Sequence, residues 1–513
     1  MKPDPAHASP TESIGLAPRG APYVEPTDLP FRAGERRRTT ILIGGLTPTH
    51  DAMVEAAWRH LGYRVEALPP VDEESLRLGR EFGSPGLCNP AHFTSGNLLK
   101  YLVRRRDVDG LSAGEIARRY AFLTAGACGP CRFGCYVAEY RRALREAGFP
   151  GVRVLAFQQM GGLRQDSGED TGLTLTPRFF HELVRALLVA DVLHLLAHRL
   201  RPYETIEGST DLALERATRR CRLAVRRGHG VVRALRACRR EFARVRVDRL
   251  ATRPRVALIG EFWAMTTTGA GNHRMQRFLE QEGAEVEVEP LVHWLLYMVW
   301  QREHDTRRRM DLRRPDAGPK GLAGRSPWRT LLRMRIARGL LRSAFAAYAR
   351  AVGLFDAEPP DMEEMARLAT GSFDPELRGG EGHLEIARTI RAARDRDVHL
   401  VLSVKPFGCL PSSGVSDGVQ PLLAHRHPGL AFCSVETTGD APALVHSRVQ
   451  MAVSKAKEGA RREMEALVRA RGVPIDEVRR RIGHDGTRAP DRRRSRHRRG
   501  STAADLYDEV AGR

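Results

Sequence analysis

Residues 39–45 (TTILIGG) begin the pattern that decides the predicted fold class. This apolar run ends in two glycines and is followed by an amphipathic stretch at residues 51–61. Apolar and polar residues then alternate at residues 63–68 (YRVEAL). A strand, a helix and a second strand in this order are typical of a βαβ unit, in which the two strands run parallel.

The second half of the chain repeats this order of elements, although not the residues. Residues 255–260 (RVALIG) predict a strand, residues 272–281 a helix and residues 284–290 (AEVEVEP) a second strand. Two such units indicate two lobes of similar build. We therefore predict an α/β protein with two Rossmann-like lobes, parallel sheets and helical insertions.

Other apolar patterns extend both lobes. Further strands are expected at residues 121–124, 152–158, 398–404 and 430–435. Helices are expected at residues 135–147, 177–247, 291–368 with a break at 315–324, and 449–471.

These elements predict the domain organisation. In chain order we expect a disordered Pro-rich tail (1–38), a first α/β lobe (39–165), a helical segment (166–250), a second α/β lobe (251–450) with a helical insertion at about 291–378, a C-terminal helix (451–483) and a basic disordered tail (484–513).

No segment has the character of a membrane span or of a secretory signal. The longest apolar run, residues 291–300 (LVHWLLYMVW), is shorter than the ~18 residues that a span needs. The first 38 residues hold seven prolines and no apolar core of a signal peptide. We therefore expect a cytoplasmic protein with no membrane partner.

The net charge of +21 raises the question of a nucleic-acid partner. The chain has six lysines and therefore 77 arginines, a skew more typical of a codon-composition bias. Two stretches are strongly basic, residues 307–342 and residues 488–499. We interpret them as a solvated helical face and a disordered tail, with attraction to an acidic partner as the alternative. We do not expect nucleic acid as a partner, because no zinc-finger, RNP-type aromatic or basic-zipper pattern is present.

Eight cysteines divide into two kinds. Cys221 and Cys238 lie in arginine-rich helical segments, where Cys221 falls on an apolar stripe and is expected in the core. The other six lie in stretches rich in Gly, Pro and Ser; they are Cys88, Cys128, Cys131, Cys135, Cys409 and Cys433. Loops of this kind are where ligand-binding sites lie in α/β folds.

Three cysteine-bearing loops are predicted to converge on one crevice. They are residues 84–97 (SPGLCNPAHFTSGN), 124–136 (TAGACGPCRFGCY) and 404–420 (VKPFGCLPSSGVSDGVQ). The ends of parallel strands can bring Cys88, Cys128 and Cys409 together around one metal centre. Backbone N–H groups at a helix start would favour the thiolate form that binds iron or zinc.

The motif CGPC leaves other interpretations open. It is also the dithiol of thioredoxin-type oxidoreductases, which would use Cys128 and Cys131. A structural zinc site and inert thiols are further alternatives. A dithiol does not account for Cys88 and Cys409 in matching loops, so we favour an iron–sulfur cluster.

Four segments together resemble the 2-hydroxyacyl-CoA dehydratase superfamily, in particular its branch of acyl-CoA dehydratase activase-related proteins. They are CNPAHFTSGNLLKYL (88–102), FLTAGACGPCRFGCYVAEYRRALREAGF (122–149), GEFWAMTTTGAGNHRMQRFLEQEGAEV (260–286) and VKPFGCLPSSGVSDGVQ (404–420). The resemblance spans residues 39–455. It implies two Rossmann-like lobes around a [4Fe-4S] cluster that three cysteines from three loops hold. Related members carry a double-cubane [8Fe-9S] cluster.

The resemblance also implies which residues bind the cluster. Cys88, Cys128 and Cys409 match the three-cysteine pattern, and Cys131 is an additional ligand. Cys135 and Cys433 are possible further ligands. Sequence alone names no catalytic residue.

The resemblance further implies the partners. A separate ATP-dependent activator, or another electron donor, would supply low-potential electrons. A related dehydratase-like subunit or a second copy would complete the assembly, and a CoA thioester is the possible substrate. The chain has no G-x-x-x-x-G-K-[ST] loop, so we do not expect the activator within it.

The functions that follow are a lyase, a reductase component, or a non-catalytic electron-transfer protein with the same cluster. A thiol–disulfide oxidoreductase stays as a weaker alternative. Near the predicted site, Ser95 or Thr94 is expected to cap a helix, and Asn272 to cap another or to face the site with Glu261. Lys405 could stabilise an anionic cluster.

Overall fold

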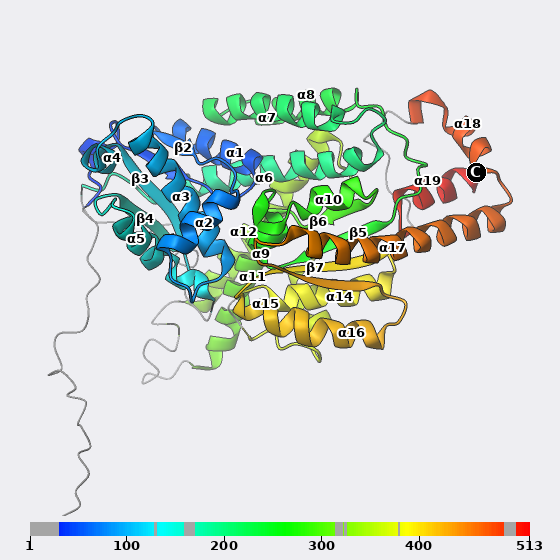
Figure 1. The fold of residues 1–513 in the computed structure, drawn as a ribbon. Coiled ribbons are helices and arrows are strands. Elements are labelled where there is room, and N and C mark those ends of the chain that lie inside the picture. Colours follow the sequence, from blue (N-terminus) through cyan, green and yellow to red (C-terminus); the bar gives the residue numbers. More distant parts are fainter. Residues whose placement is uncertain are drawn as a thin grey trace, which may run out of the picture.

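The computed structural model describes residues 30–127, 131–158, 170–312, 322, 326–377, 380–486 and 499–512. Figure 1 shows a first lobe, coloured blue to cyan, beside a second lobe that extends from green to orange. Among the described residues, no helix is both long enough and apolar enough to cross a bilayer.

Two four-stranded sheets form the frame, and all neighbouring strands are parallel. The first sheet has the order β2-β1-β3-β4, from β1 (Thr40–Ile43), β2 (Val65–Ala67), β3 (Tyr120–Gly126) and β4 (Arg153–Gln158). The second has the order β6-β5-β7-β8, from β5 (Arg255–Gly260), β6 (Glu285–Val288), β7 (Leu400–Pro406) and β8 (Phe432–Thr437). The predicted α/β class and parallel sheets are confirmed.

Helices cover both faces of the first sheet. They are α1 (Pro48–His60), α2 (Glu73–Phe82), α3 (Asn89–Asp107), α4 (Ala113–Arg119) and α5 (Tyr136–Glu146). The start of α3 differs from expectation, because Cys88 is its N-cap residue and Pro90 occupies its first turn. Proline suits that position because the first N–H groups of a helix have no partner within it. Thr94 and Ser95 therefore lie inside α3 and do not cap it.

A helical segment joins the lobes. It consists of α6 (Pro177–Leu200), α7 (Ser209–Arg227) and α8 (Val231–Phe242). One apolar cluster contains Ile41 of the first sheet, residues of α6 and Phe345 of the helix Pro327–Val352. Cys221 and Cys238 face each other within it, with 3.6 Å between their sulfur atoms, so the predicted core position of Cys221 is confirmed.

The second lobe carries more helices than the first. They are α9 (Phe262–Thr266), α10 (Met275–Gln281), α11 (Leu291–Arg308), α12 (Pro327–Val352), α13 (Met362–Ala369), α14 (Gly382–Asp395), α15 (Leu410–Gly414), α16 (Gln420–Arg426) and α17 (Pro442–Arg471). Short turns of 3-10 or π helix are η1 (Ala33–Glu35), η2 (Arg132–Cys135), η3 (Arg201–Tyr203), η4 (Ala270–Asn272), η5 (Arg309–Leu312) and η7 (Val415–Val419).

The predicted disordered tails are wrong where the structure describes them. Phe31, within the predicted N-terminal tail, is buried. At the other end, α18 (Ile475–Gly486) and α19 (Thr502–Ala511) pack on α17. The fully buried guanidinium of Arg255 donates a 2.8 Å hydrogen bond to the backbone oxygen of Arg499 and pairs with Asp505. These contacts fasten the C-terminal segment to the start of β5.

Candidate functional site

Three cysteines each lie at the start of a helix, near the carboxyl ends of the strands. Cys88 is the N-cap residue of α3, Cys131 that of η2 after β3, and Cys409 that of α15 after β7. Cys88 and Cys409 are buried, and Cys131 is half-buried. The loop of Cys88 joins α2 to α3, so it does not follow a strand directly as the other two loops do.

The two lobes touch where Cys88 and Cys409 lie. The backbone N–H of Asn89 donates a 3.0 Å hydrogen bond to the oxygen of Phe407. The amide of Asn89 donates a second one, of 2.9 Å, to the oxygen of Thr437. A Cβ atom on Gly408 would lie 3.2 Å from Cys88 Cα, and Gly408 has a φ of +77°. A glycine at this position therefore permits both the turn and the close approach of the two loops.

A tyrosine that the sequence did not single out contacts the Cys88 sulfur. Tyr136, the first residue of α5, has its hydroxyl oxygen 3.1 Å from Cys88 Sγ. Burial raises the pKa of the Tyr136 hydroxyl well above its ordinary value. It therefore keeps its proton and can donate it in a hydrogen bond to the sulfur.

The three thiols share one electrostatic neighbour, Glu261. Burial, with the charge of Glu261, raises the pKa of Cys88 and of Cys409. Burial and the charges of Glu261, Glu381 and Cys88 raise the pKa of Cys131 to about 11. Without a metal the three groups are therefore thiols at neutral pH.

Three glutamates gather beside the thiols. Glu261 caps α9, accepting a 2.8 Å hydrogen bond from Ala264 N, and Glu381 accepts one from Phe262 N. Glu385, on α14, accepts a 3.0 Å hydrogen bond from Ser412, three residues after Cys409. Burial raises the pKa of all three carboxyls, that of Glu385 to about 8. Glu385 and Glu381 are therefore mainly neutral acids near pH 7.

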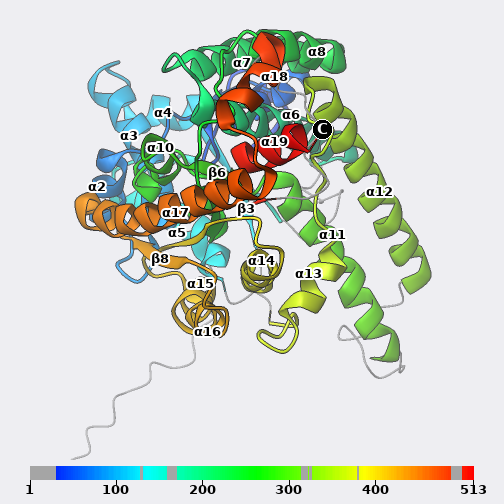
Figure 2. The same cartoon turned by 90° about the vertical axis from the view of Figure 1, so that its right-hand side faces the viewer.

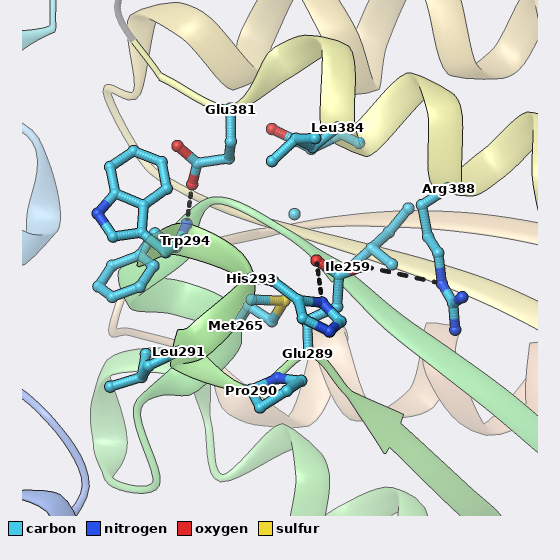
Figure 3. Close-up of a pocket in the computed structure, with 13 residues that line it drawn as sticks. Ile259, Met265, Glu289, Pro290, Leu291, His293, Trp294, Glu381, Leu384 and Arg388 are labelled. Carbon is cyan, nitrogen blue, oxygen red and sulfur yellow. Dashed lines mark hydrogen bonds and ion pairs between the residues drawn. The ribbon is translucent and has the colours of Figure 1, made fainter. Parts of the chain in front are cut away.

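A small hollow of about 30 Å³, open at one side, adjoins the glutamates (Figure 3). Its walls are mainly apolar, from Ile259, Phe262, Met265, Leu291, Trp294 and Leu384. In Figure 3, Glu381 lies on the side of α14, whereas His293 and Trp294 lie on that of α11. Glu385 of α14 also lines the hollow.

The Glu289 carboxyl in this hollow differs from the other acids. Burial alone would raise its pKa, but His293, 3.7 Å away, and the charge of Arg388 hold it below the ordinary value. The hollow therefore has neutral acids on one side and an ionised one on the other.

A second small hollow, also of about 30 Å³, shares Glu289, Pro290 and Leu291 with the first. Here Thr47 Oγ1 lies 2.7 Å from His50 Nδ1, and His50 Nε2 lies 3.1 Å from Asp191. The two oxygens of Asp191 accept hydrogen bonds of 2.8 Å from Leu291 N and Val292 N. Asp191 of α6 thus caps α11 from another helix and fixes the wall between the hollows.

Two other polar candidates have structural roles. Lys405 is buried and pairs with Asp417 and, at 3.5 Å, with Glu436, so side chains already balance its charge. The amide of Asn272 donates to the oxygens of Ala264 and Thr267, at 2.8 and 2.7 Å, and its oxygen accepts from Met275 N. Asn272 therefore braces the loop before α10 and does not face the thiols.

The remaining cysteines lie in three different settings. Cys128, predicted as a ligand, lies outside the described residues. Cys135 is exposed at the end of η2. Cys433 lies inside β8 opposite Leu402, in an apolar cluster, and the structure does not bring it to the loops of Cys88 and Cys409.

The donor set can be compared with what a metal centre needs. Among the described residues, no three His, Cys, Asp or Glu side chains are placed to hold one metal ion. A cubane cluster makes a different demand, because each cysteine binds a different iron and the sulfurs need not meet at a point. Thiols are the ligand type that such a cluster uses, and Cys88, Cys131 and Cys409 share Glu261 as a neighbour.

Comparison with models of known protein families gives no match for this chain, and comparison with curated proteins gives none either.

Proposed function

We propose that this chain is an iron–sulfur protein similar to subunits of 2-hydroxyacyl-CoA dehydratases. It would accept low-potential electrons from a separate ATP-dependent activator or another donor and act on a CoA thioester or another small molecule. One observation carries the proposal: Cys88, Cys131 and Cys409 come from three loops of both lobes and share Glu261 as a neighbour.

Cys88, Cys131 and Cys409 would hold the cluster, together with Cys128 from the CGPC motif. A [4Fe-4S] cluster needs no more ligands than these, whereas an [8Fe-9S] cluster would need others, such as the exposed Cys135. The bound cluster supplies one-electron chemistry at low potential. The Tyr136 hydroxyl would support it by donating a hydrogen bond to the Cys88 sulfur.

The hollow beside Glu381 and Glu385 is our proposed substrate site. Its walls are mainly apolar, and a low-polarity surrounding strengthens hydrogen bonds made there. Glu385 Oε2 is buried and has no hydrogen-bond partner among the described residues, whereas Oε1 is held by Ser412. As a neutral acid, Glu385 can donate a proton from Oε2 to a substrate oxygen, which is what departure of a hydroxyl group requires.

A thiol–disulfide oxidoreductase is less well supported. A dithiol of Cys128 and Cys131 gives no role to Cys88 and Cys409, the thiols that share Glu261 with Cys131. The raised pKa of Cys131 suits a ligand that loses its proton only when a metal binds.

The test is anaerobic reconstitution of four proteins with iron and sulfide, followed by visible absorption. The wild type and Cys221→Ser, a buried core cysteine, should gain equal absorption of an iron–sulfur cluster. Cys88→Ser and Cys409→Ser should gain less than half of it. Equal absorption in all four proteins would contradict the proposed ligands.

A further inference from the structure

Helix α12 (Pro327–Val352) lies along the outer edge of the molecule in Figure 2. Its inner side contributes Leu331, Phe345 and Ala349 to buried contacts, and it packs on α6, α8 and α11. This packing fixes which side of the 26-residue helix faces outward.

The outward side carries a row of large apolar residues. Trp328, Leu332, Ile336 and Leu340 are 66%, 59%, 53% and 66% exposed. Residues four apart lie on one side of a helix, so the four form a continuous ridge, which we call the α12 ridge. In the part of the chain that the structure describes, no other helix exposes four such residues. An apolar strip of this kind is typical of a surface that is covered in function.

The charge of α12 is of one sign. The helix contains six arginines and no Asp, Glu or Lys. Arg329, Arg333 and Arg350 are exposed, and neither Arg329 nor Arg333 has an ion-pair partner among the described residues. The neighbouring helix α8 adds exposed Arg233, Arg236 and Arg240. The covering partner must therefore supply negative charge.

Two kinds of partner fit this chemistry poorly. A second copy of α12 would bring more arginines and no carboxylates, so the charges would repel. Nucleic acid would satisfy the arginines but leave four exposed apolar side chains without a matching surface.

A bilayer with anionic lipids supplies both features. Its phosphates attract arginine, and the boundary between headgroups and acyl chains accepts apolar side chains and especially tryptophan. A convex ridge also needs no complementary groove there.

We propose that α12 binds the surface of a bilayer containing anionic phospholipid, with the α12 ridge at the headgroup boundary and the arginines on phosphates. Surface attachment needs no spanning helix, so this proposal replaces the sequence-based expectation of no membrane partner.

The test is flotation of the whole protein with two kinds of vesicle, pure phosphatidylcholine and a mixture with phosphatidylglycerol. Binding should occur to the mixed vesicles only, weaken with added salt, and shift the tryptophan fluorescence to shorter wavelength. The variant Leu332→Ser/Ile336→Ser/Leu340→Ser should lose at least tenfold in affinity. Arg329→Ala/Arg333→Ala should lose about 30-fold, since each basic residue near the surface contributes about fivefold.

The matched control is Leu444→Ser/Met451→Ser on α17, whose side chains are as exposed as those of the ridge. This variant should float like the wild type, and all variants should keep the wild-type melting temperature because the changed residues are exposed. Absence of binding to mixed vesicles, or binding that survives the triple serine change, would overturn the proposal. So would concentration-dependent dimerisation that the triple serine change abolishes, because a second copy would then cover the ridge.

Discussion

The N–H of Asn89 donates a hydrogen bond to the oxygen of Phe407 at 3.0 Å, joining the residue after Cys88 to a residue just before Cys409. The two residues are more than three hundred positions apart and belong to different lobes. This bond is therefore the point at which the two lobes align two of the proposed ligands.

Gly408→Ala should weaken the contact between the lobes. Gly408 has a φ of +77°, and a new Cβ would lie 3.2 Å from Cys88 Cα. We expect a loss of about 1–2 kcal/mol in the free energy of unfolding, measured by denaturant titration, because a side chain is strained in this conformation. Gly414→Ala is the control: it has helical φ and ψ with open space beside it, and should be neutral or stabilising. Equal effects of the two changes would count against the tight contact.

Tyr136→Phe should lower the reduction potential of the reconstituted cluster. The change keeps the ring and removes the hydroxyl 3.1 Å from Cys88 Sγ. A hydrogen bond to a ligand sulfur stabilises the reduced, more negative state, so its loss should make the midpoint potential more negative. A redox titration measures this shift. Tyr140→Phe, whose hydroxyl bonds Thr94 at 2.8 Å, should leave the potential unchanged, and an equal shift in both variants would refute the role of Tyr136.

Glu385→Gln should change how stability depends on pH. The folded-state pKa of Glu385 is about 8, above the ordinary 4.5, so the wild type loses stability as pH rises between these values. In this window the unfolded carboxyl gives up its proton while the folded one keeps it, at a cost of about 1.4 kcal/mol per pH unit. The stability of the variant relative to the wild type should therefore increase from about pH 5 to pH 8 and then level off. Urea titrations across this range that gave parallel curves would show that Glu385 is not buried as an acid.

Asp191→Ala should destabilise the protein more than loss of an ordinary helix cap. Asp191 is buried and satisfies Leu291 N, Val292 N and His50 Nε2, which would all lose a partner. We expect a loss of about 2–4 kcal/mol. Asp361→Ala removes the exposed N-cap of α13. Among the described residues this cap accepts only from Glu363 N, at 2.8 Å, so its loss should lower the free energy of unfolding by about 1 kcal/mol. Thermal or urea unfolding of both variants checks the difference, and similar losses would contradict the bracing role of Asp191.

Local patterns were sufficient to predict the sheets. Strands such as β5 and β7 follow from short apolar runs, because a strand buried on both faces is mostly apolar. The edge strand β2 follows from alternation of apolar and polar residues. The placement of Cys409 and Cys131 after strands followed from the same patterns.

Long-range contacts explain what the sequence did not reveal. Glu381 and Glu385 are ordinary helix residues in sequence, and only packing against α9 and Ser412 makes them buried acids. Helix α19 follows an arginine-rich stretch, and its position depends on Arg255. This arginine donates to the backbone oxygen of Arg499, just before α19, and pairs with Glu285 of β6. Thr94 and Ser95 are good cap residues in sequence, yet α3 already begins after Cys88, since its first turn tolerates Pro90.

The most direct test of the central claim is the content of iron and acid-labile sulfide per chain in anaerobically purified protein. The account predicts about four irons, or about eight for a double cubane, with matching sulfide. It also predicts that both fall together in Cys409→Ser. Protein that holds no iron after careful anaerobic reconstitution, while remaining folded, would contradict the cluster and the function built on it.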